Sequence, residues 1–285
     1  MVKFLTFFIL ISTPFTLRAA QIEFMPASPI QGEPVLITLY GVSATSSIKD
    51  GFFNKQPLNF FIYEGKTLAL AGIDLLGKIG TSSVIVNFKD GTKIFKELIV
   101  SERPKIEMPM EIPQKLGGNT KVAAQKLITN LISEQATIGK ISSIVKSKIF
   151  WKEKFRFPIM DPIVTDNYGY SRDTVGYSIS HKGTDFKAEI GTPVLAINRG
   201  VVRDNNTYTS FGKTIIVDHG FGLYSMYMHL SKTKVNVGQL VLPGQVIALS
   251  GDTGYTTGAH LHLTIRINGI SIDPIKFYEL FGVRI

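Results

Sequence analysis

Short apolar runs separated by turn residues constrain the fold of this chain more than any other feature of its sequence. Six such runs lie between Gln21 and about Pro104, and Asp90-Gly91 between the last two is a strong hairpin signal. Runs this short bury their apolar side chains when two sheets face each other, which predicts a small antiparallel β-sandwich. The segment has no histidine and no clustered acids, so we expect a spacer, binding or regulatory module rather than a catalytic one.

The segment after Pro104 has a different character. Pro104, Pro109 and Pro113 indicate an extended connector, and Asn119-Thr120 can cap a helix that follows it. Apolar residues then recur at helical spacing, namely Ala124, Leu127, Ile128, Leu131 and Ile132. Such a stripe predicts a packing face without chemistry of its own. We therefore expect a linker that contains a helical hairpin or a long bent helix, with the break near Gly139.

Strand-like runs return at about Phe157 and continue to Val283, again separated by Gly and Pro. No long segment here has the apolar period of a helix, so this part is also expected to be mostly β. The whole chain is therefore predicted to be mainly β. An N-terminal antiparallel sandwich covers residues 20–104, a linker with a helix covers 105–154, and a C-terminal β-rich domain covers 155–285.

The first 20 residues have the layout of a secretory signal. Lys3 precedes an apolar run of 14 residues, Phe4–Leu17, which is shorter than the ~20 residues of a membrane-spanning helix, and small residues follow. We expect residues 1–19 to be a signal peptide that is cleaved after Ala19. The protein would then be exported to the periplasm or cell envelope, or secreted, with no stable membrane span. The alternatives are an uncleaved membrane anchor and a buried N-terminal strand.

Composition narrows the possible partners and chemistry. The chain has 31 Lys+Arg against 22 Asp+Glu and a formal net charge of +9, but only 19% of its residues are charged. Because no nucleic-acid motif accompanies this charge, no nucleic-acid partner is expected. The charge indicates either attraction to anionic envelope material or simply a soluble surface. The absence of cysteine excludes disulfides, cysteine-based zinc sites, iron–sulfur clusters and cysteine nucleophiles.

All five histidines lie in the last 105 residues, and histidine carries metal and proton chemistry near neutral pH. In HKGTD, His181 and Asp185 are four residues apart, and Gly183 between them favours a bend that turns both side chains toward one point. In HLHLTIRI, His260 and His262 are two apart on a predicted strand, so their rings project from the same face. Imidazoles and a carboxylate together provide the three protein ligands of a catalytic zinc, which keeps its fourth position for water.

Each grouping also has a simpler interpretation. A lone HxxxD pair is usually a surface ion pair, and histidines on a strand can be core residues with hydrogen-bond partners. Both groupings in one domain, with His229 in YMHLS as a third element, favour a metal site. His219 in VDHG is equally consistent with a turn residue and Asp218 with a structural role. GDTGYTTGAH lacks the ending of a phosphate-binding loop, so we interpret it as a flexible hairpin at the rim of a cleft.

The order of these motifs resembles a known family. HKGTDF, GTPV, DHGFGLYSMYMHLS, GDTGYTTGAHLHL and NGISIDP, from about Pro158 to Tyr278, are similar to the lysostaphin-type or LytM-like zinc metallopeptidases, which cut peptide bonds in bacterial peptidoglycan. The resemblance implies a β-rich domain with a groove over the metal. It also implies that His181, Asp185 and His262 bind zinc, while His229 and His260 activate water and stabilise the oxyanion.

Two hypotheses of different classes follow from this resemblance. The first is an exported zinc metalloendopeptidase that hydrolyses peptide crosslinks or stem peptides of peptidoglycan. The alternative is a non-catalytic envelope regulator that binds cell wall or activates a separate wall hydrolase. Because degenerate domains of the second kind generally lack ligands, the complete set of matched residues favours the enzyme. The sequence carries no signal for an oligomeric state.

Overall fold

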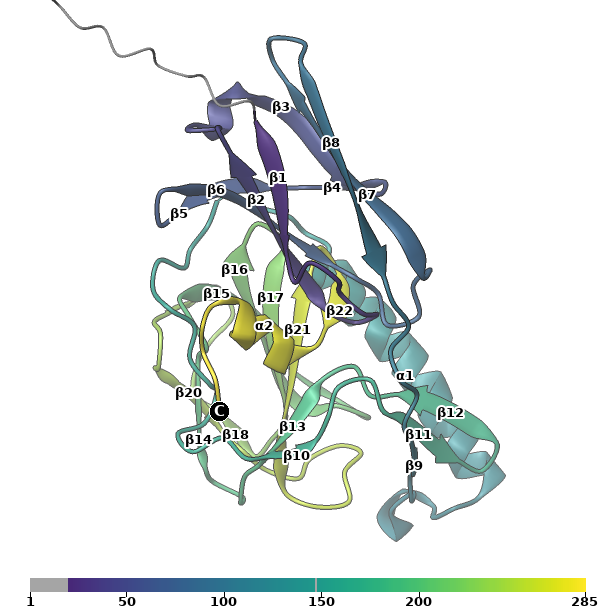
Figure 1. Ribbon diagram of the computed structural model, residues 1–285. Coiled ribbons are helices and arrows are strands. Elements are labelled where there is room, and N and C mark those ends of the chain that lie inside the picture. Colours follow the sequence, from purple (N-terminus) through teal and green to yellow (C-terminus); the bar gives the residue numbers. More distant parts are fainter. Residues whose placement is uncertain (1–19, 147) are drawn as a thin grey trace, which may run out of the picture.

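The computed structural model describes residues 20–146 and 148–285 and contains two β-rich units and one long helix (Figure 1). The prediction of a mainly β chain with a sandwich, a helical linker and a β-rich C-terminal domain is confirmed. The predicted signal peptide, residues 1–19, lies outside the described residues.

The N-terminal unit is a sandwich of two four-stranded antiparallel sheets. Its elements are β1 (Gln21–Met25), β2 (Pro34–Tyr40), η1 (Thr45–Ser47), β3 (Ile48–Phe53), β4 (Gln56–Pro57), β5 (Phe60–Tyr63), β6 (Lys66–Gly72), β7 (Gly80–Phe88) and β8 (Lys93–Val100). One sheet has the order β1-β2-β6-β5 and the other β4-β3-β7-β8. The predicted hairpin at Asp90-Gly91 joins β7 to β8.

The sheet β1-β2-β6-β5 is apolar on both faces, which explains the nearly continuous apolar runs of β2 and β6. Val35 and Ile37 point into the core of the sandwich. Leu36 and Leu70 point the other way, into the core of the C-terminal unit. Because successive side chains of a strand alternate between faces, one strand contributes to two cores. The sandwich is thereby packed directly on the C-terminal unit (Figure 1).

The linker contains one long helix that lies against the C-terminal unit. Its elements are β9 (Glu107–Pro109), η2 (Gln114–Leu116) and α1 (Lys121–Ser142). The predicted cap is present, because Thr120 Oγ1 accepts a hydrogen bond from the amide of Ala123. The expected break at Gly139 is wrong, since the helix continues to Ser142. Ile138, fully buried against the large sheet, holds this part of the helix and outweighs the low helix propensity of glycine.

The C-terminal unit is built on an eight-stranded sheet. Its elements are β10 (Val164–Asp166), β11 (Ser171–Thr174), β12 (Tyr177–Ser180), β13 (Thr184–Lys187), β14 (Pro193–Leu195), β15 (Gly200–Tyr208), β16 (Gly212–Gly220), β17 (Leu223–Leu230), β18 (Lys232–Thr233), β19 (Leu240–Val241), β20 (Val246–Leu249), β21 (His260–Ile267), β22 (Ile270–Ile272) and α2 (Pro274–Leu280). The large sheet has the order β10-β13-β21-β17-β16-β15-β19, with β22 beside β21. Smaller sheets have the orders β12-β11-β9 and β14-β20-β18.

Aromatic residues join the two units. Trp151, which follows the helix, is 1% exposed, and its ring centroid lies 5.3 Å from that of Phe61 in the sandwich. The ring centroids of Phe155 and Phe281 lie 5.3 and 5.5 Å from that of Trp151. No helix in the described parts of the chain is both long enough and apolar enough to cross a membrane.

Candidate metal centre and active-site groove

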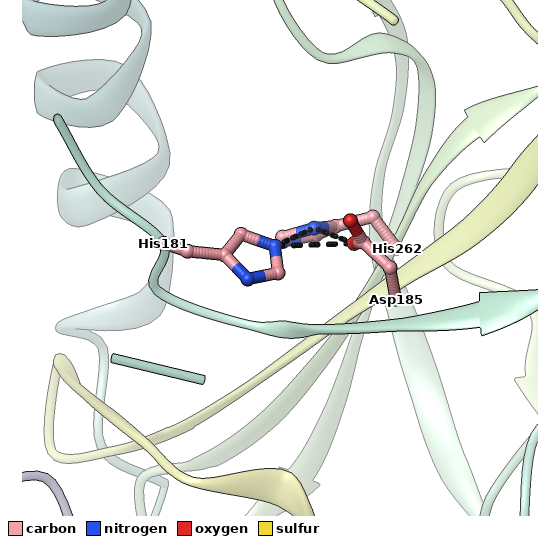
Figure 2. A group of neighbouring side chains, drawn as sticks. All are labelled: His181, Asp185 and His262. Carbon is pink, nitrogen blue, oxygen red and sulfur yellow. Dashed lines mark hydrogen bonds and ion pairs between the residues drawn. The ribbon is translucent and has the colours of Figure 1, made fainter. Parts of the chain in front are cut away.

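Three side chains from two distant segments of the sequence meet on one face of the large sheet (Figure 2). β13 pairs antiparallel with β21, and this register places Asp185 directly opposite His262. His181 reaches the same point from the loop before β13. Its Nε2 lies 3.1 Å from Asp185 Oδ1 and 3.1 Å from His262 Nδ1. His262 Nδ1 lies 2.7 Å from Asp185 Oδ1.

This spacing fits a single metal ion. The donor atoms of the three residues lie within 4.8 Å of one another, and all three side chains are buried. Ligands bound tetrahedrally at ~2.1 Å from a zinc ion are roughly 3.4 Å apart, close to the separations found here. Two imidazoles and one carboxylate also leave one of the four positions open, which is typical of a catalytic rather than a structural zinc site.

Hydrogen bonds behind the two imidazoles fix which nitrogen faces the centre. His181 Nδ1 lies 2.8 Å from the carbonyl oxygen of Asn167 and donates to it, which leaves the lone pair on Nε2. His262 Nε2 lies 3.0 Å from Thr264 Oγ1, whose own hydrogen is donated to the carbonyl of Lys182. The Thr264 oxygen therefore accepts from His262, and Nδ1 of this ring is free to bind a metal. Outer partners of this kind orient ligands and strengthen metal binding.

The charge state of the cluster also suits a cation. Burial alone would raise the pKa of Asp185, but the adjacent His181 and His262 outweigh it and hold the pKa well below its usual range. Burial lowers the pKa of His262 to about 4, so this ring is neutral at pH 7. Arg172 donates from Nη2 to Asp185 Oδ2 at 2.8 Å and also contacts Asp166. The second carboxylate oxygen is thus occupied, and Oδ1 remains directed at the two imidazoles.

Two further histidines stand beside the cluster. His260 begins β21 and His229 lies near the end of β17; their ring centroids are 4.8 Å apart. His260 Nδ1 lies 2.9 Å from the carbonyl of Gly258, and His229 Nδ1 lies 2.8 Å from that of Thr253. Donation to these carbonyls leaves both Nε2 atoms as proton acceptors. His260 Nε2 is 3.8 Å from Asp185 Oδ2, at the margin of the ligand cluster.

The backbone of His229 is held in an uncommon conformation. Its φ of 59° lies in the left-handed region, which costs a non-glycine residue roughly 1–2 kcal/mol. Its amide donates to the carbonyl of Phe211 at 2.9 Å, which helps to hold this conformation. Burial, together with the nearby His260 and His262, lowers the pKa of His229 to about 3. The ring is therefore neutral at pH 7 and able to accept a proton.

A cavity of about 560 Å³ opens beside the cluster, and the linker helix forms its opposite wall. His181, His229 and His262 line one side, while Leu127 and Leu131 of α1 line the other. The helix stripe expected to be a packing face therefore lines the cavity beside the candidate site, with Ile132 at its exposed edge.

Polar residues of α1 hold the helix in this position. Both carboxylate oxygens of Glu134 accept hydrogen bonds from backbone amides in the loop between β15 and β16. Gln135 and Ser142 both contact the guanidinium of Arg266, which lies on the same strand as His262. The helix is therefore held beside the groove by hydrogen bonds to the loop between β15 and β16 and to strand β21.

A second hollow of about 370 Å³ lies beside Asp185 and His260. Residues Met108–Glu111 of the linker line it, opposite the loop residues Tyr255–Ala259. The GDTGYTTGAH segment was expected to form the rim of a cleft, and the structure has it there. The two hollows share the lining residues Met110, Arg172 and Tyr255, and both reach the metal cluster, so we describe them together as a groove.

Comparison with known proteins identifies this arrangement. Residues 179–274 match the model of peptidase family M23, a span that holds His181, Asp185 and His262. These residues form an M23 peptidase domain. An uncharacterized metalloprotease of Haemophilus influenzae is 44% identical over 97 residues, which make up 33% of this chain and 20% of that protein. The resemblance inferred from the motifs is confirmed.

Similarity also extends beyond the M23 domain. The peptidoglycan DD-endopeptidase ShyA of Vibrio cholerae is 28% identical over 211 residues, which make up 70% of this chain and 48% of ShyA. The chain spans less than half the length of either relative. A Pseudomonas aeruginosa protein assigned to peptidase M23 has a crystal structure that matches with a TM-score of 0.68 and 25% identity. The match covers 88% of this chain and 95% of that one. Sandwich, linker and M23 domain thus recur together.

The structure brings together all five residues singled out from the sequence, namely His181, Asp185, His229, His260 and His262. The residues that orient them were not predicted from the sequence. Thr264 could have been predicted from the sequence, because it continues the alternation of His260 and His262 on one face of a strand. Arg172 could not, since only the tertiary structure brings its hairpin to Asp185.

The fifth histidine, His219, lies in the hydrophobic core rather than in the groove. It belongs to β16 and is fully buried, with Nδ1 2.8 Å from the carbonyl of Arg199 and Nε2 2.8 Å from Ser225 Oγ. Burial lowers its pKa from 6.5 to about 4. Its neighbour Asp218 is paired with Arg203 and is fully buried, which agrees with a structural role.

Buried neutral His219 makes stability depend on pH. Between pH 6.5 and about 4 the unfolded chain binds a proton at this residue and the folded chain does not. The contribution of neutral His219 to the free energy of unfolding is therefore complete above pH 6.5. It is lost as the pH falls toward 4, by up to about 3 kcal/mol. Urea unfolding of the parent and of His219→Gln at pH 7 and 4.5 measures the effect. The parent should lose about 2–3 kcal/mol more than the variant; equal losses would contradict the assignment.

Proposed function

We propose that this chain is an exported zinc metalloendopeptidase that hydrolyses peptide bonds of bacterial peptidoglycan. The observation that carries the proposal is the geometry of His181, Asp185 and His262. Their donor atoms lie close enough together to bind one metal ion. An outer hydrogen bond fixes the metal-facing nitrogen of each imidazole, and the cluster lines a groove. An inactive member of the fold would not need a complete ligand set with its outer partners.

The residues beside the metal cluster are suited to proton transfer. A zinc ion held by this set supplies Lewis acidity, which polarises a peptide carbonyl and lowers the pKa of water. The Nε2 atoms of His229 and His260, left free by the hydrogen bonds at Nδ1, accept a proton from the attacking water and return it to the leaving amine. Once protonated, the same Nε2–H group donates toward the negative charge that develops on the peptide oxygen. Removal of either ring therefore affects turnover more than metal binding.

The substrate class rests on the relatives. ShyA is named as a peptidoglycan DD-endopeptidase, and lysostaphin from Staphylococcus simulans is 39% identical over 122 residues, which make up 40% of this chain. A groove made of two hollows that both reach the metal cluster suits an extended peptide. Export agrees with a substrate outside the cytoplasm and with the signal-like residues 1–19. N-terminal sequencing of the protein recovered from cells distinguishes a start at Ala20 from a retained leader.

Metal removal and wall digestion test the proposal together. Purified protein is treated with a chelator, reloaded with zinc and incubated with purified peptidoglycan, and released fragments are identified by mass spectrometry. We expect fragments that arise from peptide-bond cleavage, a loss of at least about 100-fold without metal, and recovery with zinc. Because α1 covers the groove, Glu134→Ala is assayed in parallel. If neither protein cleaves when zinc is bound, the proposal fails in favour of the regulator.

A further inference from the structure

The helix that covers the groove carries a single acidic residue, Glu134, and this residue is buried. Its Oε1 accepts from the amide of Thr209 at 2.6 Å and from that of Ser210 at 3.1 Å. Its Oε2 accepts from the amide of Ser210 at 3.0 Å. A carboxylate thus fills a concave pair of backbone N–H groups, which is the usual shape of an anion-binding nest.

This amide pair belongs to the catalytic groove. Thr209 and Ser210 form the turn between β15 and β16, and Ser210 lines the same cavity as His181, His229 and His262. The next residue, Phe211, accepts a hydrogen bond at its carbonyl from the amide of His229. The carbonyl of Ser210 accepts from the amide of Tyr255 on the opposite rim. The nest is therefore fixed by both rims of the groove, independently of the helix that fills it.

A third donor in the nest lacks a partner. Ser210 is 3% exposed, and its hydroxyl oxygen has no hydrogen-bond partner among the described residues. An unpaired buried hydroxyl costs roughly 1–3 kcal/mol and is uncommon in native proteins. Glu134 therefore uses only part of the donor set. A ligand that approaches from within the groove, rather than from the covering helix, can use the two amides and the hydroxyl together.

We propose that the amides of Thr209 and Ser210, with the Ser210 hydroxyl, form a subsite for a free carboxylate of the peptide substrate. Glu134 fills this subsite while α1 covers the groove. The inference rests on the proposed function, because wall peptides bear free carboxylates. It makes α1 a competitor of the substrate: the same donors bind either the helix or the peptide.

Binding in a protein that does not turn over tests the subsite directly. In the full-length His260→Ala protein, calorimetry compares a synthetic stem peptide that has free carboxylates with the same peptide fully amidated. We expect Glu134→Ala to strengthen binding of the carboxylate peptide about tenfold or more, because charge-assisted hydrogen bonds become available to it. The amidated peptide should bind weakly and change little. When Ser210→Ala is added to the His260→Ala, Glu134→Ala protein, it should weaken binding of the carboxylate peptide severalfold and leave binding of the amidated peptide unaffected.

Controls separate the subsite from general effects. Glu97→Gln removes the same charge from an exposed position of the sandwich and should bind both peptides as the His260→Ala protein does. Thermal unfolding of each variant checks folding, and Glu134→Gln, which keeps the side-chain shape, replaces Glu134→Ala if that variant unfolds. Equal affinity of Glu134→Ala for the two peptides would overturn the subsite. So would unchanged carboxylate affinity on removal of Glu134.

The subsite and the proposed enzyme activity fail separately. A protein that cleaves peptidoglycan but does not distinguish the two peptides retains the function and loses the subsite. A protein that distinguishes the peptides but cleaves nothing with zinc bound loses the endopeptidase assignment and retains the subsite.

Discussion

His262→Ala should abolish zinc retention, whereas His260→Ala should keep zinc and lose turnover. His262 supplies one of three protein donors, and its neighbours Asp185 and His181 cannot replace it, since their donor atoms already face the same point. Two remaining ligands hold zinc poorly, so the metal should be lost on dialysis. His260 contributes no ligand in this geometry, but without its Nε2 a proton acceptor is missing, which costs about 100- to 10,000-fold in rate.

Zinc content by mass spectrometry and fragment release from purified peptidoglycan measure the two effects. His219→Gln is the matched control, because it removes a histidine that lies outside the groove; it should keep both zinc and activity at pH 7. The assignment of ligands is contradicted if His262→Ala retains one zinc per chain. The assignment of proton transfer is contradicted if His260→Ala digests wall as fast as the parent.

The local composition of the site is predictable from the sequence, but its assembly is not. The alternation of His260 and His262 on a strand is enough to place both rings on one face. Asp185 comes opposite His262 only through the antiparallel pairing of β13 with β21, a register that no spacing within either motif encodes. Arg172 shows the limit most clearly, since it belongs to none of the motifs singled out and still contacts the ligand carboxylate.

The fold is predictable to a similar degree. The strand β3 is difficult to predict from the sequence, because Asp50 and Gly51 interrupt its apolar residues and resemble a turn. Gly51 is needed there, since a Cβ atom would lie 2.6 Å from the ring of Phe60. The helix α2 is too short to show an apolar period, although its start carries clear signals: Asp273 caps it, and proline follows at its first position.

The helix α1 shows why a pattern does not reveal a partner. Its apolar stripe predicts burial, which is found for Ala124 and Leu127, whereas Ile132 is 67% exposed; the surface that the stripe faces is the groove beside the metal cluster. The stripe alone is equally compatible with packing against the sandwich. Glu134, a single acidic residue at the edge of that stripe, distinguishes packing on the groove from packing on the sandwich. A buried carboxylate needs hydrogen-bond donors, and the backbone amides at the rim of the groove supply them.

Gly183→Ala should impair the metal centre although it alters no ligand. A Cβ atom at this position would lie 2.3 Å from His262 Nε2 and 2.6 Å from the backbone oxygen of Leu263. Contacts this short require displacement of the imidazole and of the paired strand, because the Leu263 oxygen cannot rotate away. We expect zinc affinity to fall by about 10- to 100-fold and the free energy of unfolding of the zinc-free protein to fall by about 1–3 kcal/mol.

Competition with a chromophoric chelator measures the zinc affinity, and urea unfolding of the zinc-free protein measures the stability. Gly139→Ala in α1 is the matched control, since a Cβ there meets nothing within 4 Å and alanine is the better helix former. It should leave zinc affinity unchanged and raise stability by up to about 1 kcal/mol. If Gly183→Ala binds zinc as tightly as Gly139→Ala, the close approach of residue 183 to His262 does not determine the position of the ring. The bend in HKGTD would then serve only to turn the chain toward the sheet, and the metal centre would tolerate a side chain at its edge.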